Sequence, residues 1–170
     1  TWSLMTAASN GTANVSGTAA SPTITYAPNG DFNGTDSFVV KVADETTLSD
    51  TITVNVTVSN VNDAPVISTG NAKTINENQT YALDVNATDI DSSSSSFAWS
   101  LAGGADQARF TIDASTGVLS FSLAPDYENP TDVGPDNVYE VQVTVSDGSD
   151  SSSPQMISIT IADVVEAQPP

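Results

Sequence analysis

The sequence contains no cysteine and no histidine, and only three of its 170 residues are Lys or Arg. Without cysteine, the chain has neither a disulfide framework nor a thiolate metal site. The three cations stand against 21 Asp and Glu, which gives a formal charge of −18. Such a charge argues against nucleic acid and anionic membranes as partners. No apolar run reaches the length of a membrane span, so membrane insertion is not expected.

Aromatic residues are also scarce, at 6% of the chain, which is low for a sugar-binding platform. Asp126 and Glu128 are two carboxylates of the kind that a glycosidase uses, but they are neighbours in one expected loop and lack a surrounding aromatic platform. We find no combination of nucleophile, base and cofactor motif elsewhere. The sequence therefore predicts a protein that is not an enzyme.

What the chain does have is strict alternation of apolar and polar residues. Residues 51–58, 139–145 and 157–161 each place apolar side chains at every second position. This period is typical of half-buried antiparallel strands. Shorter candidate strands lie between Asn-Gly, Thr-Gly and Asp-Gly turn signals. Many short strands with regular turns predict an all-β protein built as a β-sandwich.

The chain also repeats one order of features: strand, Asp-bearing turn, strand, acidic junction. The first copy ends at Asn62-Asp63 and the second at Asp163 to Glu166. This repetition predicts tandem modules with a boundary at Ala64-Pro65, since Pro ends the preceding strand. We expect residues 1–64 to form a partial sandwich that lacks its first strands, and residues 65–170 to form a complete one.

The acids are concentrated in the second module, which holds fifteen of the 21. None of the candidates falls on an alternating apolar face, so we place them in the loops at the two ends of the sandwich. Counting strand reversals puts Asp89, Asp91 and Asp147 near one end. Glu77, Asp126, Glu128 and Glu166 are assigned to the other end. Because Ca²⁺ takes 6–8 oxygen ligands, such clusters are suited to calcium.

Over the second module the sequence resembles the cadherin repeat. Asp89-Ile90-Asp91 matches the Asp-x-Asp of that family, and Asp126-Tyr127-Glu128 matches its Asp-Arg-Glu with Tyr in place of Arg. Glu77 corresponds to the early Glu of the repeat, and Asp147 to the Asp after the penultimate strand. Asn62-Asp63-Ala64-Pro65 resembles the family's linker.

Residues 25–38 (TYAPNGDFNGTDSF) resemble the bacterial cadherin-like variety, so the resemblance covers nearly the whole chain. It implies two tandem Ig-like Greek-key β-sandwiches with calcium held between modules. The implied ligands at the junction are Asp31, Asp36, Asn62, Asp63, Asp89, Asp91 and Asp147. A second half-site, which a following module would complete, would use Glu77, Asp126, Glu128 and Glu166.

The leading hypothesis is a calcium-rigidified structural or adhesive repeat protein, secreted or on a cell surface. Its partners would be neighbouring modules of the same chain, identical chains, or cell-surface and polysaccharide ligands. One alternative is the protomer of an extracellular filament, in which a neighbour supplies the missing strands. Another is a polysaccharide-binding module of an extracellular enzyme.

Overall fold

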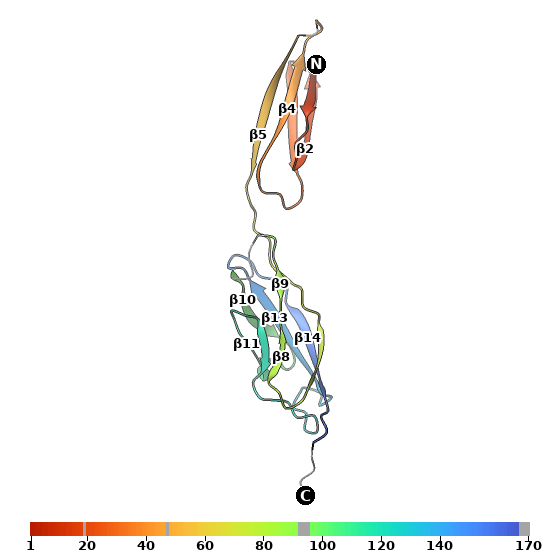
Figure 1. Cartoon of the computed structure of the whole chain (residues 1–170), viewed down its shortest axis with the longest axis vertical. Helices are drawn as coiled ribbons and strands as arrows, with labels where there is room; N and C mark the ends of the chain where they lie inside the picture. Colours follow the sequence, from red (N-terminus) through yellow and green to blue (C-terminus); the bar gives the residue numbers. More distant parts are fainter. Residues whose placement is uncertain (19, 47, 92–95, 167–170) are drawn as a thin grey trace. The chain divides into compact units, whose positions relative to one another are not determined.

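The computed structural model describes residues 1–18, 20–46, 48–91 and 96–166, which form mainly strands and turns. The chain divides into two compact units, unit 1 (Thr1–Val61) and unit 2 (Asn62–Pro170). Both are built from paired β-strands (Figure 1). The all-β fold expected from the alternating pattern is confirmed. The linker residues Asn62, Asp63 and Ala64, which the sequence placed at the end of the first module, belong to unit 2.

Unit 1 contains a three-stranded sheet of order β1-β4-β5 and the hairpin β2-β3. Its strands are β1 (Trp2–Thr6), β2 (Gly11–Thr18), β3 (Ser21–Pro28), β4 (Gly34–Ala43) and β5 (Ser49–Val58). The buried core is small and consists of Ala13, Phe38 and Val40. Tyr26 stacks on Phe38 with ring centroids 6.1 Å apart, so the hairpin and the sheet contact each other through aromatic rings.

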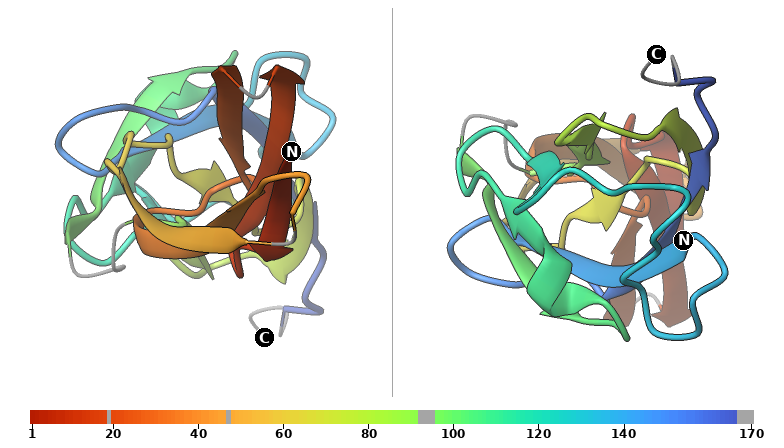
Figure 2. Two further views of the ribbon diagram at one scale, coloured as in Figure 1. Left: turned by 90° about the horizontal axis from the view of Figure 1, so that it is seen from above. Right: turned by 90° about the horizontal axis from the view of Figure 1, so that it is seen from below.

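Unit 2 contains a four-stranded sheet of order β10-β13-β14-β7, a three-stranded sheet β11-β12-β8 and the pair β6-β9. The layers are seen end-on in Figure 2. Its strands are β6 (Val66–Ile67), β7 (Ala72–Asn76), β8 (Tyr81–Asp84), β9 (Ala87–Thr88), β10 (Ala98–Gly103), β11 (Phe110–Ile112), β12 (Val118–Phe121), β13 (Val138–Ser146) and β14 (Gln155–Ala162). The 3-10 helix η2 (Gln107–Arg109) precedes β11.

The core of unit 2 follows from the period-2 pattern of its two longest strands. On β13, Val141, Val143 and Val145 are fully buried. On β14, Ile157 and Ile159 are also 0% exposed, and the two strands pair antiparallel. Burying a side chain of this size contributes about 1.5–3 kcal/mol relative to leaving it in water. The alternation read from residues 139–145 and 157–161 is thus the inward face of the principal sheet.

The strands of the two units pair in the same order, so unit 1 can be compared with unit 2 strand by strand. Strands β1 to β5 of unit 1 pair with one another as β10 to β14 do in unit 2. In unit 2, β7 adds parallel to β14 and β8 adds to β12. The described residues of unit 1 contain no strand in either position. Val54 and Val56 on β5 are only half-buried, whereas their counterparts on β14, Ile157 and Ile159, are 0% exposed.

Asp36 on β4 joins the hairpin end of unit 1 to its sheet. It is 8% exposed. One carboxylate oxygen accepts hydrogen bonds from the backbone N–H groups of Ser9 (3.1 Å) and Ser37 (2.8 Å). The other accepts from the N–H of Asn10 (2.8 Å) and the hydroxyl of Tyr26 (3.0 Å). Burial alone would raise the pKa of Asp36, but these four donors outweigh it and hold the pKa below its usual value.

A tight turn between β11 and β12 depends on a glycine. Gly117 has a φ of +74°, in the left-handed region that L side chains avoid. A Cβ built there would lie 2.5 Å from the carbonyl oxygen of Val85 and 2.9 Å from the ring of Trp99. The Val85 N–H also donates to the Gly117 carbonyl at 2.9 Å. The turn is therefore packed too closely against β8 and β10 to accept a side chain.

Gly117→Ala is expected to lower the free energy of unfolding of unit 2 by about 2–5 kcal/mol, because positive φ and overpacking both add strain. Gly134 is the matched control, since its φ is +121° but no atom lies within 4 Å of a built Cβ. Gly134→Ala should cost only the conformational part, about 1–2 kcal/mol. Chemical denaturation of the three proteins measures this, and equal losses in the two variants would contradict the packing argument.

Asp36→Asn is expected to destabilise unit 1 at pH 7, because the amide cannot accept four hydrogen bonds as the carboxylate does. A carboxyl whose folded-state pKa is depressed contributes stability above its unfolded pKa, near 3.8, and loses it as the pH falls through the folded value. The difference in melting temperature between wild type and variant should therefore shrink as the pH is lowered below about 4. Asp50→Asn, which changes an exposed acid of β5, is the control; a gap for Asp36→Asn that is independent of pH would refute the assignment.

Candidate metal centre

The first acidic end of unit 2, which we call the linker pole, contains Asn62, Asp63, Asp89, Asp91, Asp147 and Asp150. The Asn62 amide Nδ2 donates to Asp147 Oδ2 and to Asp150 Oδ2, both at 2.9 Å. The backbone N–H of Asp63 donates to Asp91 Oδ2 at 2.7 Å. Two residues of the linker are therefore bound to two different loops of unit 2.

The loop geometry at this pole follows from the local sequence. Asp89 and Asp91 follow β9, and the Asp91 N–H donates to Asp89 Oδ1 at 2.7 Å. Asp147 follows β13, and its Oδ1 accepts from the N–H groups of Ser149 and Asp150 in a turn through Gly148. The Asp150 N–H, the Asn62 amide and the Ser149 N–H lower the pKa of Asp147. Asp147 therefore stays ionised, as a cation ligand must.

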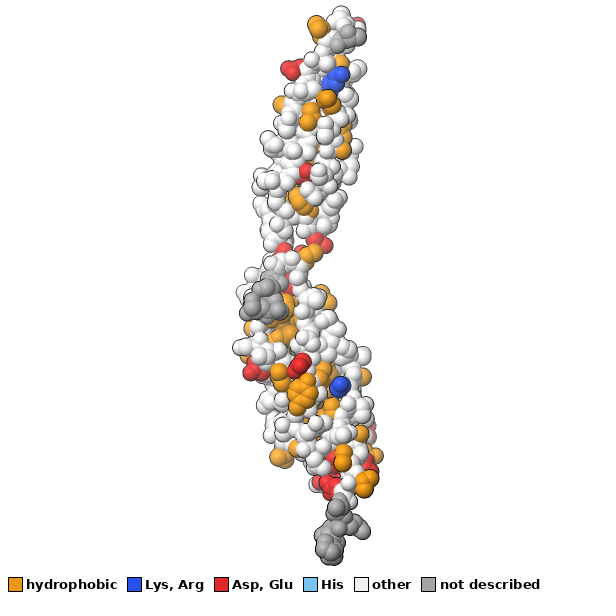
Figure 3. Space-filling model, in the orientation of Figure 1, with side chains coloured by type: hydrophobic (Ala, Val, Ile, Leu, Met, Phe, Trp, Pro, Cys, Tyr) orange, Lys and Arg blue, Asp and Glu red, His pale blue; other side chains and the backbone are white. Residues whose placement is uncertain are grey.

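The second acidic end of unit 2, which we call the distal pole, contains Glu77, Asp126, Glu128, Asp163 and Glu166. Carboxylate oxygens of Glu77, Asp126 and Glu128 lie within 4.8 Å of one another. Figure 3 shows acidic side chains close to the C-terminal end of the described chain. Glu77 directly follows β7, whereas Asp126 and Glu128 lie in the loop before β13. The fold therefore brings together acids about 50 residues apart in the sequence.

Glu77 is the buried member of the distal pole, at 4% exposed. Its Oε2 accepts the Tyr127 N–H at 2.8 Å, and its Oε1 accepts the Val164 N–H at 2.9 Å. These two hydrogen bonds lower the pKa of Glu77. One carboxylate thus fixes two segments of chain at the distal pole, and its lowered pKa keeps it ionised at neutral pH.

The neighbouring negative charges at the distal pole disfavour the ionised form of Glu128. A hydrogen bond with its own backbone N–H lowers its pKa, but burial and the charges of Glu77, Asp163 and Asp126 outweigh it and raise the pKa. Unit 2 has only Lys73 and Arg109 as cationic side chains, against sixteen acids. Neither is among the groups that set the pKa of Glu128. The repulsion is of the kind that a bound cation removes.

The outermost predicted acid is held at the distal pole by an asparagine. Glu166 Oε1 accepts a hydrogen bond from Asn78 Nδ2 at 3.0 Å, and the Asn78 N–H donates to the Pro125 carbonyl at 2.9 Å. Asn78 has a φ of +64°, a conformation that Asn tolerates better than most residues. Glu166 therefore lies beside the segment that carries Asp126 and Glu128.

Sequence reasoning missed two acids. Asp150 shares the Asn62 amide with Asp147, and its signal was the second Asp three residues after the first in one turn. Asp163 acts on Glu128 through its charge, and its signal was its place directly after β14. Both acids lie outside the alternating apolar runs, but neither belongs to a motif of the cadherin repeat.

Two predicted ligands lie in unit 1. Asp31 is exposed in a turn closed by the hydrogen bond from the Phe32 N–H to the Asn29 carbonyl, and its own φ is +60°. Its role as a ligand stays a prediction. Asp36 is buried, and its two oxygens already accept four hydrogen bonds within unit 1. We therefore leave Asp36 out of the ligand set proposed below.

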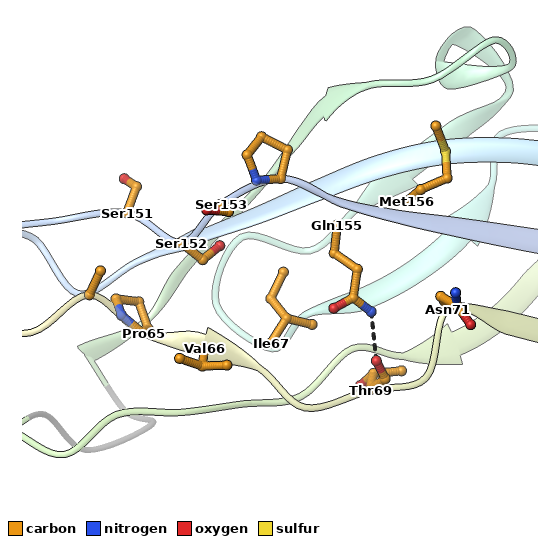
Figure 4. A pocket seen from close by; sticks show the side chains of 12 residues that line it. Pro65, Val66, Ile67, Thr69, Asn71, Ser151, Ser152, Ser153, Gln155 and Met156 are labelled. Atoms are coloured by element: carbon orange, nitrogen blue, oxygen red, sulfur yellow. Dashed lines mark hydrogen bonds between the residues drawn. The ribbon is translucent and has the colours of Figure 1, made fainter.

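Both poles fit a hard divalent cation. They offer carboxylate oxygens and amide groups, and the chain has no thiol or imidazole to attract a softer metal. By contrast, the groove between residues 64–71 and the start of β14 has no acidic lining residue (Figure 4). The Gln155 amide crosses it to the Thr69 carbonyl at 2.6 Å. No helix in the described part of the chain is long and apolar enough to cross a membrane.

The bacterial Ig domain family model matches residues 1–57 and 62–160. Mouse protocadherin Fat 4 is 33% identical over 129 residues, which is 71% of this chain and 2% of that protein. Halomucin of Haloquadratum walsbyi is 37% identical over 68 residues, which is 39% of this chain and 1% of that protein. This chain therefore spans a very small part of these relatives.

Solved cadherin structures share the fold. Repeats EC1-3 of protocadherin gamma C5 match 94% of this chain and 55% of theirs, with a TM-score of 0.67 and 20% identity. Repeats EC1-2 of human protocadherin-24 match 92% of this chain and 83% of theirs, with a TM-score of 0.59 and 20% identity. The family match, the strand order and the acidic motifs agree, and the chain belongs to the bacterial Ig domain family as a pair of cadherin-like repeats.

Proposed function

We propose that calcium ions at the poles of these cadherin-like modules stiffen a structural or adhesive protein of the cell surface or extracellular space. The observation that carries the proposal is the convergence of Glu77, Asp126 and Glu128 oxygens within 4.8 Å. One similar structure is described as the extracellular domain of protocadherin gamma B4. That description supports the location proposed for this chain.

At the linker pole, the proposed ligands are Asp63, Asp89, Asp91 and Asp147, with Asp150 added to the set. Asn62 supplies a neutral group that contacts Asp147 and Asp150 without adding charge. The amide is able to turn its oxygen toward a cation in place of its nitrogen toward the carboxylates.

At the distal pole, the proposed ligands are Glu77, Asp126, Glu128 and Glu166, with Asp163 added. A following module would complete this site. When bound, calcium supplies positive charge that neutralises the repulsion among these acids. The side chains themselves hold the connecting segment in one orientation, since Glu77 bonds both the Tyr127 and the Val164 backbone.

The expected energies are large relative to the stability of one module. Extracellular calcium modules bind with dissociation constants of roughly 0.1–1 mM. At a calcium concentration of about 100 times the dissociation constant, each site adds about 2.7 kcal/mol to the folded state. A domain of this size is stable by only about 5–15 kcal/mol. Calcium binding at one site would therefore add a large fraction of the free energy of unfolding of a module.

Calcium is expected to raise the melting temperature of unit 2, and a chelator should reverse the rise. Glu128→Gln should lose much of that increase, while its calcium-free form should be at least as stable as the wild type because one repelling charge is gone. Glu140→Gln removes an equal charge from an exposed position on β13 and should leave the calcium effect unchanged. Differential scanning calorimetry measures all three. Identical melting curves for the wild type in calcium and in chelator would refute the proposal.

Calcium affinity is expected to weaken as the pH falls, and to do so above the usual Glu pKa of 4.5, because the pKa of Glu128 is raised. Protonation and calcium compete for the same carboxylate, so the affinity is greatest above the raised pKa and declines through it. Calorimetric titration at pH 7 and pH 5 and constant ionic strength measures the change. Glu128→Gln should flatten the dependence; an equally steep decline in that variant would show that Glu128 is not the titrating ligand.

A further inference from the structure

Asn137, the residue directly before β13, has three unusual features together. Its φ is +63°, in the left-handed region. Its side-chain Nδ2 donates to the Tyr127 carbonyl at 3.0 Å. Its Oδ1 is buried and has no hydrogen-bond partner among the described residues. Asn tolerates this backbone conformation, but a buried acceptor without a partner costs free energy and calls for an explanation.

Unit 1 shows that the backbone alone does not require asparagine here. In the shared strand order, β4 and β5 correspond to β13 and β14. Gly34 begins β4 with a φ of +116° and pairs with Val58, much as the Asn137 carbonyl accepts the Ile161 N–H at 2.9 Å. Glycine adopts a positive φ at this position with less strain than asparagine does. The asparagine side chain of unit 2 therefore needs its own explanation.

That explanation lies in the residue that Asn137 contacts. Tyr127 is the centre of the Asp126-Tyr127-Glu128 segment of the distal pole. Its N–H donates to Glu77 Oε2 at 2.8 Å, and its carbonyl accepts from Asn137. The backbone between the two outer acids is thus held on its amide side by Glu77 and on its carbonyl side by Asn137.

We propose that Asn137 is a positioning residue that orients Asp126 and Glu128 toward Glu77 and so sets the cation affinity of the distal pole. Asn137 acts through the Tyr127 carbonyl, because the orientation of the peptide after Tyr127 fixes where Glu128 begins. This inference rests on the proposed calcium function. The inference goes beyond that function because it assigns control of the cation affinity to a neutral side chain outside the acidic motifs.

The test compares Asn137→Gly with the wild type in the full chain. Glycine accepts the positive φ and removes only the side-chain contact, so the calcium-free melting temperature should change little. Calcium is titrated while the ¹H–¹⁵N shifts of Tyr127 and Glu128 report the distal pole and those of Asp91 and Asp147 report the linker pole. The distal affinity should fall by about tenfold, as for groups that orient metal ligands, and the linker-pole affinity should not change.

Asn71→Gly is the matched control, because Asn71 is exposed before β7, lies outside the distal pole, and makes its own contact through its backbone carbonyl, which accepts the Ser158 N–H. It should leave both affinities as in the wild type. An Asn137→Gly protein with wild-type distal affinity would overturn the positioning role, whether or not its melting temperature falls. Shifts of Tyr127 and Glu128 that do not respond to calcium in the wild type would instead overturn the proposed calcium site itself.

Discussion

Backbone N–H groups, rather than cationic side chains, hold the buried carboxylates of this protein. Asp36 accepts three of them, and Glu77 accepts one from each of two segments 50 and 87 residues away. Asp106, which is 3% exposed, likewise accepts the N–H groups of Val133 and Glu140. In a chain with three Lys and Arg, this is the main way to bury a negative charge. The positions of the loops, and hence of both poles, depend on it.

This constraint explains how far the sequence was informative. The apolar faces of β13 and β14 could be predicted because a period of two needs no tertiary information, and their burial followed. Glu77, Asp126 and Glu128 were grouped correctly at one end, because loops before and after antiparallel strands alternate between two ends. Asn62 and Asp63 contact Asp147 and Asp91 within unit 2, and the assignment of these residues to a calcium junction stays a prediction.

The misses have a common physical origin. Asp36 was predicted as a junction ligand, and its place on β4 facing inward was not foreseen; an inward carboxylate is tolerable there because three N–H groups converge on it. Such convergence depends on the folded loops and leaves no pattern in the sequence. Asn137 was overlooked for the same reason, since a positive φ and a contact with Tyr127 cannot be read from an Asn before a strand.

The attachment of Asn62 and Asp63 to unit 2 has a consequence for how such proteins lengthen. Genes of repetitive proteins grow by copying a segment and joining it to another. A copied segment that starts at Asn62 would bring its connector already bonded to Asp147, Asp150 and Asp91. These contacts would form within the copied segment itself, whatever the sequence of the segment that precedes it.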